Sequence, residues 1–343
     1  MKKTTAKPKP TSENLLEESK KMMKREGRKG WDFAKKTLLQ QKTRNSQLKE
    51  ALSYAVELPD YFRPAIISFC CKAVGGNAEV TIPCGASFVL LAKAIGMHDD
   101  IIDNLKMRNK RQTLFGKFGK ETALITSDIL MFKAFTLMRK NADLGVSQQT
   151  TAKILETIDK FWFEQGESEI LELQSRRKTD VTPQECLAKI RMRASELETI
   201  ARTGGILGNG SEKEVEALAN YGRLLGAASI LRDELIDMLE PDVLHHRIKH
   251  ESLPLPLIYA LQNATASSKI TPIIFKKQLS NKDVRTISKI TDNIGGINYV
   301  AEHINNMVQE ACTQIDIFSD KTQELKIIAK ALIIHSAEWK LIV

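Results

Sequence analysis

Apolar residues recur along this chain at helical spacing, and short polar or glycine- and proline-containing breaks separate the apolar runs. An amphipathic pattern begins near Ser12, Gly27 and Gly30 interrupt it, and residues 31–58 predict one or two further amphipathic helices. No run of β-branched residues alternates at period two for long, and Leu, Ile, Ala, Lys and Glu are plentiful. The pattern therefore favours an all-α chain.

The rest of the chain continues as a series of helices. Thr182 and Glu185 flank Pro183 in the order of a capping box with proline at the first helical position, which predicts a helix start. A polar connector is expected over residues 239–253. The predicted helices cover residues 65–74, 83–103, 118–139, 150–175, 182–205, 212–237 and 257–263, with three or so between 270 and 343.

Length and composition fit one large domain. The 343 residues are 42% hydrophobic and 27% charged, which is enough to bury a large core. No linker or repeat of fixed period appears, so we expect a disordered basic tail over residues 1–12 and a single helical bundle over residues 13–343. The chain lacks a stretch of about eighteen apolar residues and a signal peptide, and its cysteines lack metal-type spacing. These features predict a cytoplasmic protein without a transmembrane segment.

The formal net charge of +9 raises the question of a nucleic-acid or membrane partner. Much of the excess lies in the first thirty or so residues, and no basic patch is interleaved with aromatic residues, so we exclude nucleic acid. Peripheral contact with anionic lipid headgroups stays open. His245, His246 and His250 lie in the polar connector without a carboxylate or cysteine at the expected offset, and we assign them to a solvated segment rather than to zinc.

An acidic cluster ends the apolar run over residues 90–103. If the run stays helical, Asp99, Asp100 and Asp103 crowd one end of one helix face, where like charges repel unless a cation separates them. Hard oxygen ligands favour Mg²⁺, which keeps several waters and shares its coordination with substrate phosphates. Residues 106–111, of which four are cationic, follow directly and suit phosphate oxygens.

A lone acidic cluster is usually a solvated helix end, but this chain has a second one. Asp233, Glu234 and Asp237 again close an apolar, small-residue run and have the same i, i+1, i+4 spacing. Two such clusters, 134 residues apart from Asp99 to Asp233, predict carboxylates that face each other across a cavity and hold a diphosphate through bridging metal ions.

These motifs resemble the trans-isoprenyl diphosphate synthases, or polyprenyl synthetases, over roughly residues 45–265. Asp99-Asp100-x-x-Asp103 is similar to the first aspartate-rich motif of that family, and Asp233-Glu234-x-x-Asp237 to the second. The spacing from the first motif to Lys117-Phe118-Gly119 also matches without a gap. The leucine-proline segment after the second motif resembles residues 255–261, and Arg63-Pro64 resemble the end of an early basic motif.

The resemblance implies an isoprenoid synthase bundle around a central apolar cavity, and a homodimer. It implies that Mg²⁺ ions bridge the diphosphate of an allylic substrate, whose cation is then attacked by the double bond of isopentenyl diphosphate. Ala94 and Ile95, just before the first motif, would form the cavity floor, and neither is bulky. The implied metal ligands are Asp99, Asp100, Asp103, Asp233 and Asp237, with Glu234 as a longer ligand or an acceptor behind them. The implied diphosphate-binding residues are Arg108, Arg193 and Arg63, with Arg247 or Lys249 in place of a family lysine.

The chain departs from the family where isopentenyl diphosphate would be held. Asp60 and Tyr61 replace a lysine and an arginine, Ala92 replaces a histidine, and Asn109 replaces the second arginine of a pair. Losing several charged hydrogen bonds, each worth about 1.5–3 kcal/mol, weakens that subsite unless other cations replace them. Two alternatives therefore stay open: transfer to a non-phosphorylated acceptor or cyclisation, as in terpene synthases, and a non-catalytic subunit of a prenyl synthase.

Overall fold

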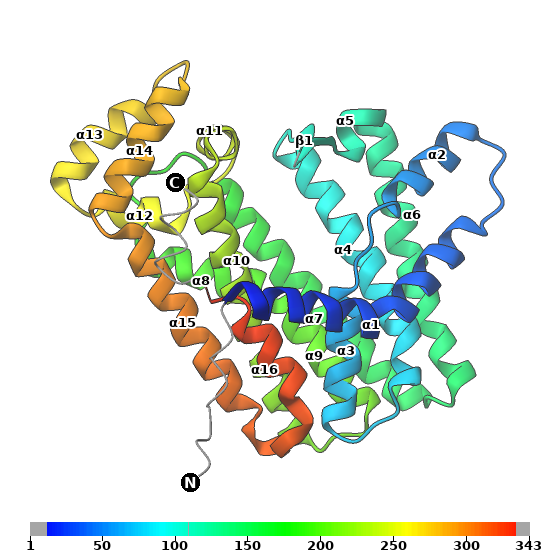
Figure 1. Cartoon of the computed structure of the whole chain (residues 1–343). Helices are drawn as coiled ribbons and strands as arrows, with labels where there is room; N and C mark the ends of the chain where they lie inside the picture. The colour runs from blue at the N-terminus through cyan, green and yellow to red at the C-terminus, as the bar shows by residue number, and fades with distance from the viewer. Residues whose placement is uncertain (1–11, 109, 334–343) are drawn as a thin grey trace, which may run out of the picture.

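The computed structural model describes residues 12–108 and 110–333, and helices account for nearly all of it (Figure 1). The first elements are α1 (Ser12–Leu39), α2 (Ser46–Ala55), α3 (Phe62–Ala73), η1 (Ala78–Thr81), α4 (Ile82–Ile102), β1 (Met107–Arg108), β2 (Arg111–Gln112), α5 (Leu114–Phe118), α6 (Lys120–Met138), η2 (Arg139–Leu144) and α7 (Gln148–Gln174). The others are α8 (Pro183–Arg193), α9 (Ser195–Leu207), α10 (Glu212–Leu239), α11 (Pro241–His250), α12 (Leu255–Leu261), α13 (Ala264–Ile274), α14 (Asn281–Asn293), α15 (Gly296–Gln314), η3 (Asp316–Thr322) and α16 (Gln323–Lys330). The predicted all-α fold is confirmed.

The two helices that end in acidic clusters form the centre of the bundle. Helix α4 packs on α6, α3 and α1, and α10 packs on α9 and α15. One continuous set of buried apolar side chains runs through all of these helices. Figure 1 shows β1 and α11, the elements that follow α4 and α10, at the same end of the bundle. This arrangement brings the two acidic segments to one end of the molecule.

Residues 78–102, which include α4, are long and apolar enough to cross a membrane. Within the fold, however, 67% of the apolar stretch is buried by neighbouring helices. A core helix of a helical protein has this composition because it is covered on all sides.

Three local predictions were wrong. The helix predicted over residues 182–205 is two helices, α8 and α9, with a break at Ala194. Helix α1 runs straight through Gly27 and Gly30, because these glycines are sites of close packing: a Cβ at Gly27 would lie 2.0 Å from the carbonyl oxygen of Tyr61, and one at Gly30 would lie 2.7 Å from Pro64. The connector predicted over residues 239–253 contains helix α11, which starts at Pro241 and buries part of one face. The tail prediction for residues 1–12 falls, apart from Ser12 at the start of α1, outside the described residues, as does the end of the last predicted helix.

Helices α9 and α10 approach so closely that a side chain is excluded between them. A Cβ at Gly222 of α10 would lie 2.3 Å from the carbonyl oxygen of Leu197 on α9, and that oxygen belongs to a helix backbone that has little freedom to move. This contact fixes the distance between the helix that carries the second acidic cluster and the helix behind it.

We predict that Gly222→Ala destabilises the protein by at least about 1–3 kcal/mol, the usual effect of overpacking. Gly96→Ala is the matched control, because Gly96 also lies inside a helix but a Cβ there meets nothing within 4 Å. Its expected effect is a gain of about 0.5–1 kcal/mol from helix propensity. Urea unfolding of both variants measures the difference, and equal midpoints would contradict the close approach of α9 and α10.

Candidate active site

The first acidic cluster lies where α4 ends. Asp99 and Asp100 are in its last turn and Asp103 caps it, so all three carboxylates meet the unfavourable negative end of the helix dipole. Arg108 on β1 binds Asp100 at 2.9 Å, and Arg176, just after α7, binds Asp103 at 2.6 Å. Asp99 is half-buried, and its carboxylate forms no hydrogen bond or ion pair with any described residue. One carboxylate of this cluster is therefore free to take a new cation.

The second acidic cluster, on α10, has the same arrangement. Arg247 of α11 binds Asp237 at 2.8 Å and Glu234 at 3.2 Å. The other oxygen of Glu234 accepts a hydrogen bond from the backbone N–H of Leu255, and the side chain is buried. Asp233 is open to solvent and is unpaired within the described part of the chain. Both oxygens of Glu234 already have partners, which favours the second of its two predicted roles, an acceptor behind the other two carboxylates.

The two clusters lie within electrostatic range of each other. Although Asp233 is exposed, the surrounding protein displaces part of the water around its carboxylate and so raises its pKa, and Arg108 beside the first cluster is among the cations that oppose this rise. Burial also raises the pKa of Glu251, which lies beside Arg247, and Asp103 and Asp237 both add to that rise. Glu251 is therefore within electrostatic range of both clusters, and Arg247 beside it pairs with Asp237. The clusters thus face one shared site.

Helix α7 forms a wall of this site that the sequence did not indicate. Glu169 and Glu172 lie on the same face of α7, and Arg176 follows one turn later. Glu172 pairs with Lys189 of α8 at 2.7 Å and also accepts a hydrogen bond from the backbone of Ser252 at 3.1 Å. The spacing of Glu169, Glu172 and Arg176 at i, i+3 and i+7 was the available signal, but nothing in the sequence set it apart from other amphipathic helices.

Arg193, the last residue of α8, belongs to the same wall of the site. It is half-buried, and no described acidic side chain pairs with it directly. Its pKa is raised, because the charges of Glu172, Glu169 and Asp99 outweigh the burial that would lower it. The guanidinium of Arg193 has free donors and lies near the unpaired carboxylate of Asp99. This combination is suited to bind a metal-bound anion such as a diphosphate.

Carboxylates outnumber their cationic partners in the shared site. This excess of negative charge indicates whether a metal ion fits there. Burial, and next the nearby carboxylate of Glu169, raise the pKa of Asp99 from its ordinary value of 3.8 to about 7. A divalent cation would remove that cost. Within residues 12–108 and 110–333, no three acidic, histidine or cysteine side chains converge into a complete metal shell. The donor set suits an ion that takes its other ligands from water and a diphosphate, as Mg²⁺ does.

Three further residues of the predicted site lie elsewhere. Arg63 binds Glu196 at 2.6 Å and Asp60 at 2.7 Å, so its charge is already neutralised and it is not free for a diphosphate. Ala94 is fully buried, its carbonyl oxygen accepts a hydrogen bond from Ser127 of α6, and it lines no open cavity floor. Ile95 is half-buried.

Helix α11 places two residues that the sequence left as alternatives. Arg247, not Lys249, contacts the acidic cluster, and Lys249 lies near the charges of His245 and His250 instead. The assignment of these histidines to a solvated segment was wrong for His246, which is half-buried and has its Nε2 3.8 Å from a carboxylate oxygen of Glu251. A pattern of three histidines in a polar stretch carried no signal of this contact.

With this geometry in place, comparisons with known proteins identify the class. The polyprenyl synthetase family model matches residues 45–291, most of the chain. The sequence is 25% identical over 301 residues to geranylgeranyl diphosphate synthase of Methanosarcina mazei, covering 87% of this chain and 92% of that protein. It is 30% identical over 211 residues to octaprenyl diphosphate synthase of Escherichia coli, covering 59% of this chain and 62% of that protein.

Solved structures agree on the fold. The crystal structure of geranylgeranyl pyrophosphate synthetase from Pyrococcus horikoshii superposes with a TM-score of 0.82 at 22% identity, over 94% of this chain and 99% of that one. This chain belongs to the polyprenyl synthetase family. It is a prenyltransferase of isoprenoid biosynthesis.

We predict that Asp99→Asn abolishes most activity yet stabilises the metal-free protein. Removing a group that stabilises transition-state charge costs about 10²–10³-fold in kcat. Because the folded-state pKa of Asp99 is about 7, its ionisation weakens the folded state fully above pH 7, and this cost fades as the pH falls toward 3.8. The variant should therefore melt higher than the wild type at pH 8 in EDTA, and the gap should shrink at pH 5.

Asp292→Asn, at an exposed position of α14, is the control and should melt like the wild type at both pH values. Mg²⁺ should stabilise the wild type at pH 8 more than it stabilises Asp99→Asn. If Asp99→Asn melts lower than the wild type at pH 8 without metal, the crowding of carboxylates around Asp99 is refuted.

Proposed function

We propose that this chain elongates an allylic prenyl diphosphate by condensing it with isopentenyl diphosphate, with Mg²⁺ as the cofactor. The observation that carries this proposal is that each acidic cluster of the shared site has one carboxylate without an ion-pair partner among the described residues. These carboxylates belong to Asp99 and Asp233. Bound Mg²⁺ would act as a Lewis acid on the diphosphate leaving group. The residues expected to hold it are Asp99, Asp100, Asp103, Asp233 and Asp237.

The arginines of the site have a separate task in this reaction. Arg193, which has free donors, and Arg108, which is 60% exposed, would bind the diphosphate oxygens and offset the charge that develops as the carbon–oxygen bond breaks. The π electrons of the isopentenyl double bond then form the new carbon–carbon bond, and a proton leaves the adjacent carbon to give the longer allylic diphosphate. Arg176 and Arg247 keep the remaining carboxylates apart and in place.

The acceptor side needs a different explanation, because Asp60, Tyr61, Ala92 and Asn109 replace residues of the family pattern. Asn109 lies outside the described residues. Asp60 is paired with Arg63, which also pairs with Glu196, so these three residues keep one net negative charge that a nearby cation can offset. Lys93 of α4 lies close enough to Asp60 and Arg63 for both charges to shift its pKa.

Lys93 has the properties of a substrate-binding cation. It is half-buried, its Nζ donates to the carbonyl oxygen of Leu58 at 3.0 Å, and no described carboxylate pairs with it directly. Burial lowers its pKa to about 8, despite the opposing charge of Asp60. Arg111 is close enough to contribute to this lowering. Arg111 already pairs with Glu57 at 2.6 Å. We infer that Lys93 supplies the positive charge for the acceptor diphosphate.

The overall proposal is tested by incubating the full-length protein with labelled allylic diphosphate and Mg²⁺, with and without isopentenyl diphosphate. Elongated diphosphates that require both the co-substrate and the metal would support it. Release of hydrocarbon or alcohol without isopentenyl diphosphate, or no turnover with any allylic substrate, would refute it.

The acceptor assignment makes its own prediction. Lys93→Met should raise the KM for isopentenyl diphosphate about tenfold or more, since one charged hydrogen bond is worth about 1.5–3 kcal/mol. The KM for the allylic substrate should stay nearly unchanged, and Lys93→Arg should restore much of the affinity. Steady-state kinetics with each substrate varied in turn measures both effects. An unchanged KM for isopentenyl diphosphate in Lys93→Met would refute the assignment of Lys93.

We also propose a homodimer that pairs through α6 and α7. Each helix exposes a pair of large apolar residues seven positions apart: Ile125 and Phe132 on α6, and Phe163 and Ile170 on α7. Phe132 and Phe163 are 74% and 76% exposed, which is unusual for phenylalanine unless a partner covers it. A second copy of the chain offers the same apolar surface and is the partner that the family resemblance implies.

The double variant Phe132→Glu/Phe163→Glu should convert a dimer into a monomer, which light scattering after size-exclusion chromatography would measure. Ile317→Glu, at another exposed apolar position, should leave the dimer intact. A monomeric wild type, or a double variant that still dimerises, would exclude this interface.

A cytoplasmic location completes the proposal. All five cysteines are free thiols, and four of them are buried, as expected for a protein kept in a reducing compartment.

A further inference from the structure

The outward face of α1 is strongly basic. The inner side of this helix packs on α3, α4 and α16, and Figure 1 shows α1 crossing the outside of the bundle in front of α3. Its exposed acidic residues are Glu17, Glu18 and Asp32. Its exposed cations over residues 20–29 are Lys20, Lys21, Lys24, Arg25, Arg28 and Lys29. The eleven residues that precede α1 contain four more lysines.

Intramolecular ion pairs neutralise only part of this charge. Lys20 pairs with Glu17 at 2.8 Å, and Arg28 with Asp32 at 3.5 Å. In contrast, Lys21, Lys24 and Arg25 have no acidic partner within the described residues. These three positions lie on adjacent turns, so their charges add over one stretch of surface.

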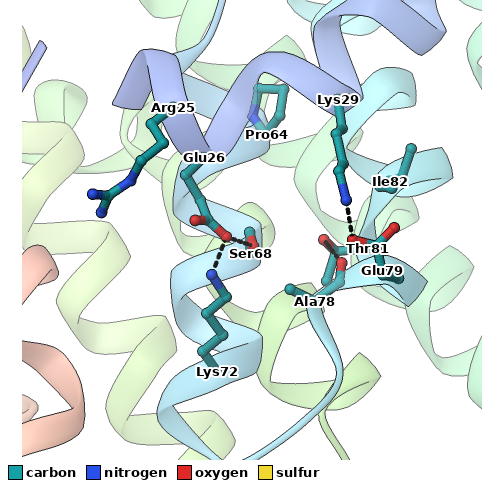
Figure 2. Close-up of a pocket in the computed structure, with 11 residues that line it drawn as sticks. Arg25, Glu26, Lys29, Pro64, Ser68, Lys72, Ala78, Glu79, Thr81 and Ile82 are labelled. Atoms are coloured by element: carbon teal, nitrogen blue, oxygen red, sulfur yellow. Dashed lines mark hydrogen bonds and ion pairs between the residues drawn. The ribbon is translucent and has the colours of Figure 1, made fainter. Parts of the chain in front are cut away.

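A pocket of about 230 Å³ opens beside these residues, between α1, α3 and η1 (Figure 2). Arg25 and Lys29 of α1 and Lys72 of α3 surround it. Lys29 pairs with Glu79 at 2.5 Å, and Lys72 pairs with Glu26. Three cations against two carboxylates leave the pocket with one excess positive charge.

The pocket has room for several water molecules, each of which takes about 30 Å³ in the liquid. A phosphate group, which is only a few times larger than a water molecule, therefore fits. The hydroxyls of Ser68 and Thr81 also line the pocket, but they already donate to Glu26 and to the carbonyl oxygen of Ala78, so a bound anion would depend on the cations. Its position in the basic face means that an anion bound there would lie close to the outer surface of α1. A headgroup attached to a larger surface is therefore a suitable occupant.

We propose that the basic face of α1 docks on a membrane that contains anionic phospholipid, with one headgroup phosphate in the pocket beside Arg25. The length suits such a surface: a helix of 28 residues is about 42 Å long. The charge fits a negative lipid surface. Nucleic acid fits less well, because Trp31 is buried and α1 exposes no aromatic ring on which bases would stack.

Docking of this kind suits a prenyltransferase, because its product is an amphiphile with a long apolar tail. The face exposes almost no large apolar side chain over residues 14–36, so the attachment is electrostatic and does not require insertion. The proposed membrane docking does not depend on the chemistry at the acidic clusters, so each of the two proposals can be tested without the other.

The test is sedimentation of the full-length protein with two kinds of vesicle, phosphatidylcholine alone and phosphatidylcholine mixed with phosphatidylglycerol. We expect binding to the mixed vesicles only, with release at 1 M salt, where surface charges are screened within about 3 Å. The triple variant Lys21→Glu/Lys24→Glu/Arg25→Glu should lose at least about tenfold in vesicle affinity. Its activity on water-soluble short substrates should equal that of the wild type.

A second triple variant on α14, Lys282→Glu/Arg285→Glu/Lys289→Glu, makes the same change in net charge at three exposed positions and should bind as the wild type does. Equal loss in both variants would show that net charge alone drives binding and would overturn the assignment to α1. Binding of inorganic phosphate or single-stranded RNA through the α1 residues, without binding to anionic vesicles, would overturn the membrane partner.

Discussion

Repulsion between carboxylates is the constraint on which this structure depends. Two core helices end in acidic clusters at the same end of the bundle, and a helix end of negative polarity is the least favourable place for acids. The fold accommodates them with Arg108, Arg176 and Arg247, each of which comes from a different segment outside α4 and α10. The arginines neutralise the flanking acids and leave one carboxylate of each cluster free. The charge that the protein does not neutralise alone is what Mg²⁺ and an anionic substrate would complete in the proposed reaction.

The supporting scaffold is rigid where that site needs it to be. Arg176 pairs with Asp103 through its side chain and forms a backbone bridge with Ser252, so one residue ties the end of α4 to the segment between α11 and α12. Lys189 and Glu172 meet at the same Ser252. Because these contacts cross between segments that are distant in sequence, loss of one would loosen both clusters together. Buried pairs of this kind contribute little net stability but fix geometry, which is the contribution that a metal site requires.

The sequence predicted the parts of this arrangement that are local. Periodicity located α4 and α10, and the i, i+1, i+4 spacing identified the two acidic clusters, because helix geometry alone places those residues together. It did not identify Glu169, Glu172 or Arg176, whose relevance arises only from the packing of α7 against the end of α4. The same limit explains the error at Gly27 and Gly30. Glycine breaks an isolated helix, but here it lets other segments approach α1 closely, and no sequence pattern separates the two cases.

The distribution of charge over the molecule is explained by sequence and fold together. A chain with a net charge of +9 has an active site in which acids predominate, and the two facts agree only because the charges are separated in space. The acids are collected at the ends of α4 and α10, whereas unpaired cations gather on the outer side of α1. In a uniform mixture the lysines of α1 would pair with the acids and fill the metal site with ammonium groups. Separation keeps Asp99 and Asp233 open to a divalent ion, and it leaves a basic face that is free to interact with a negative surface.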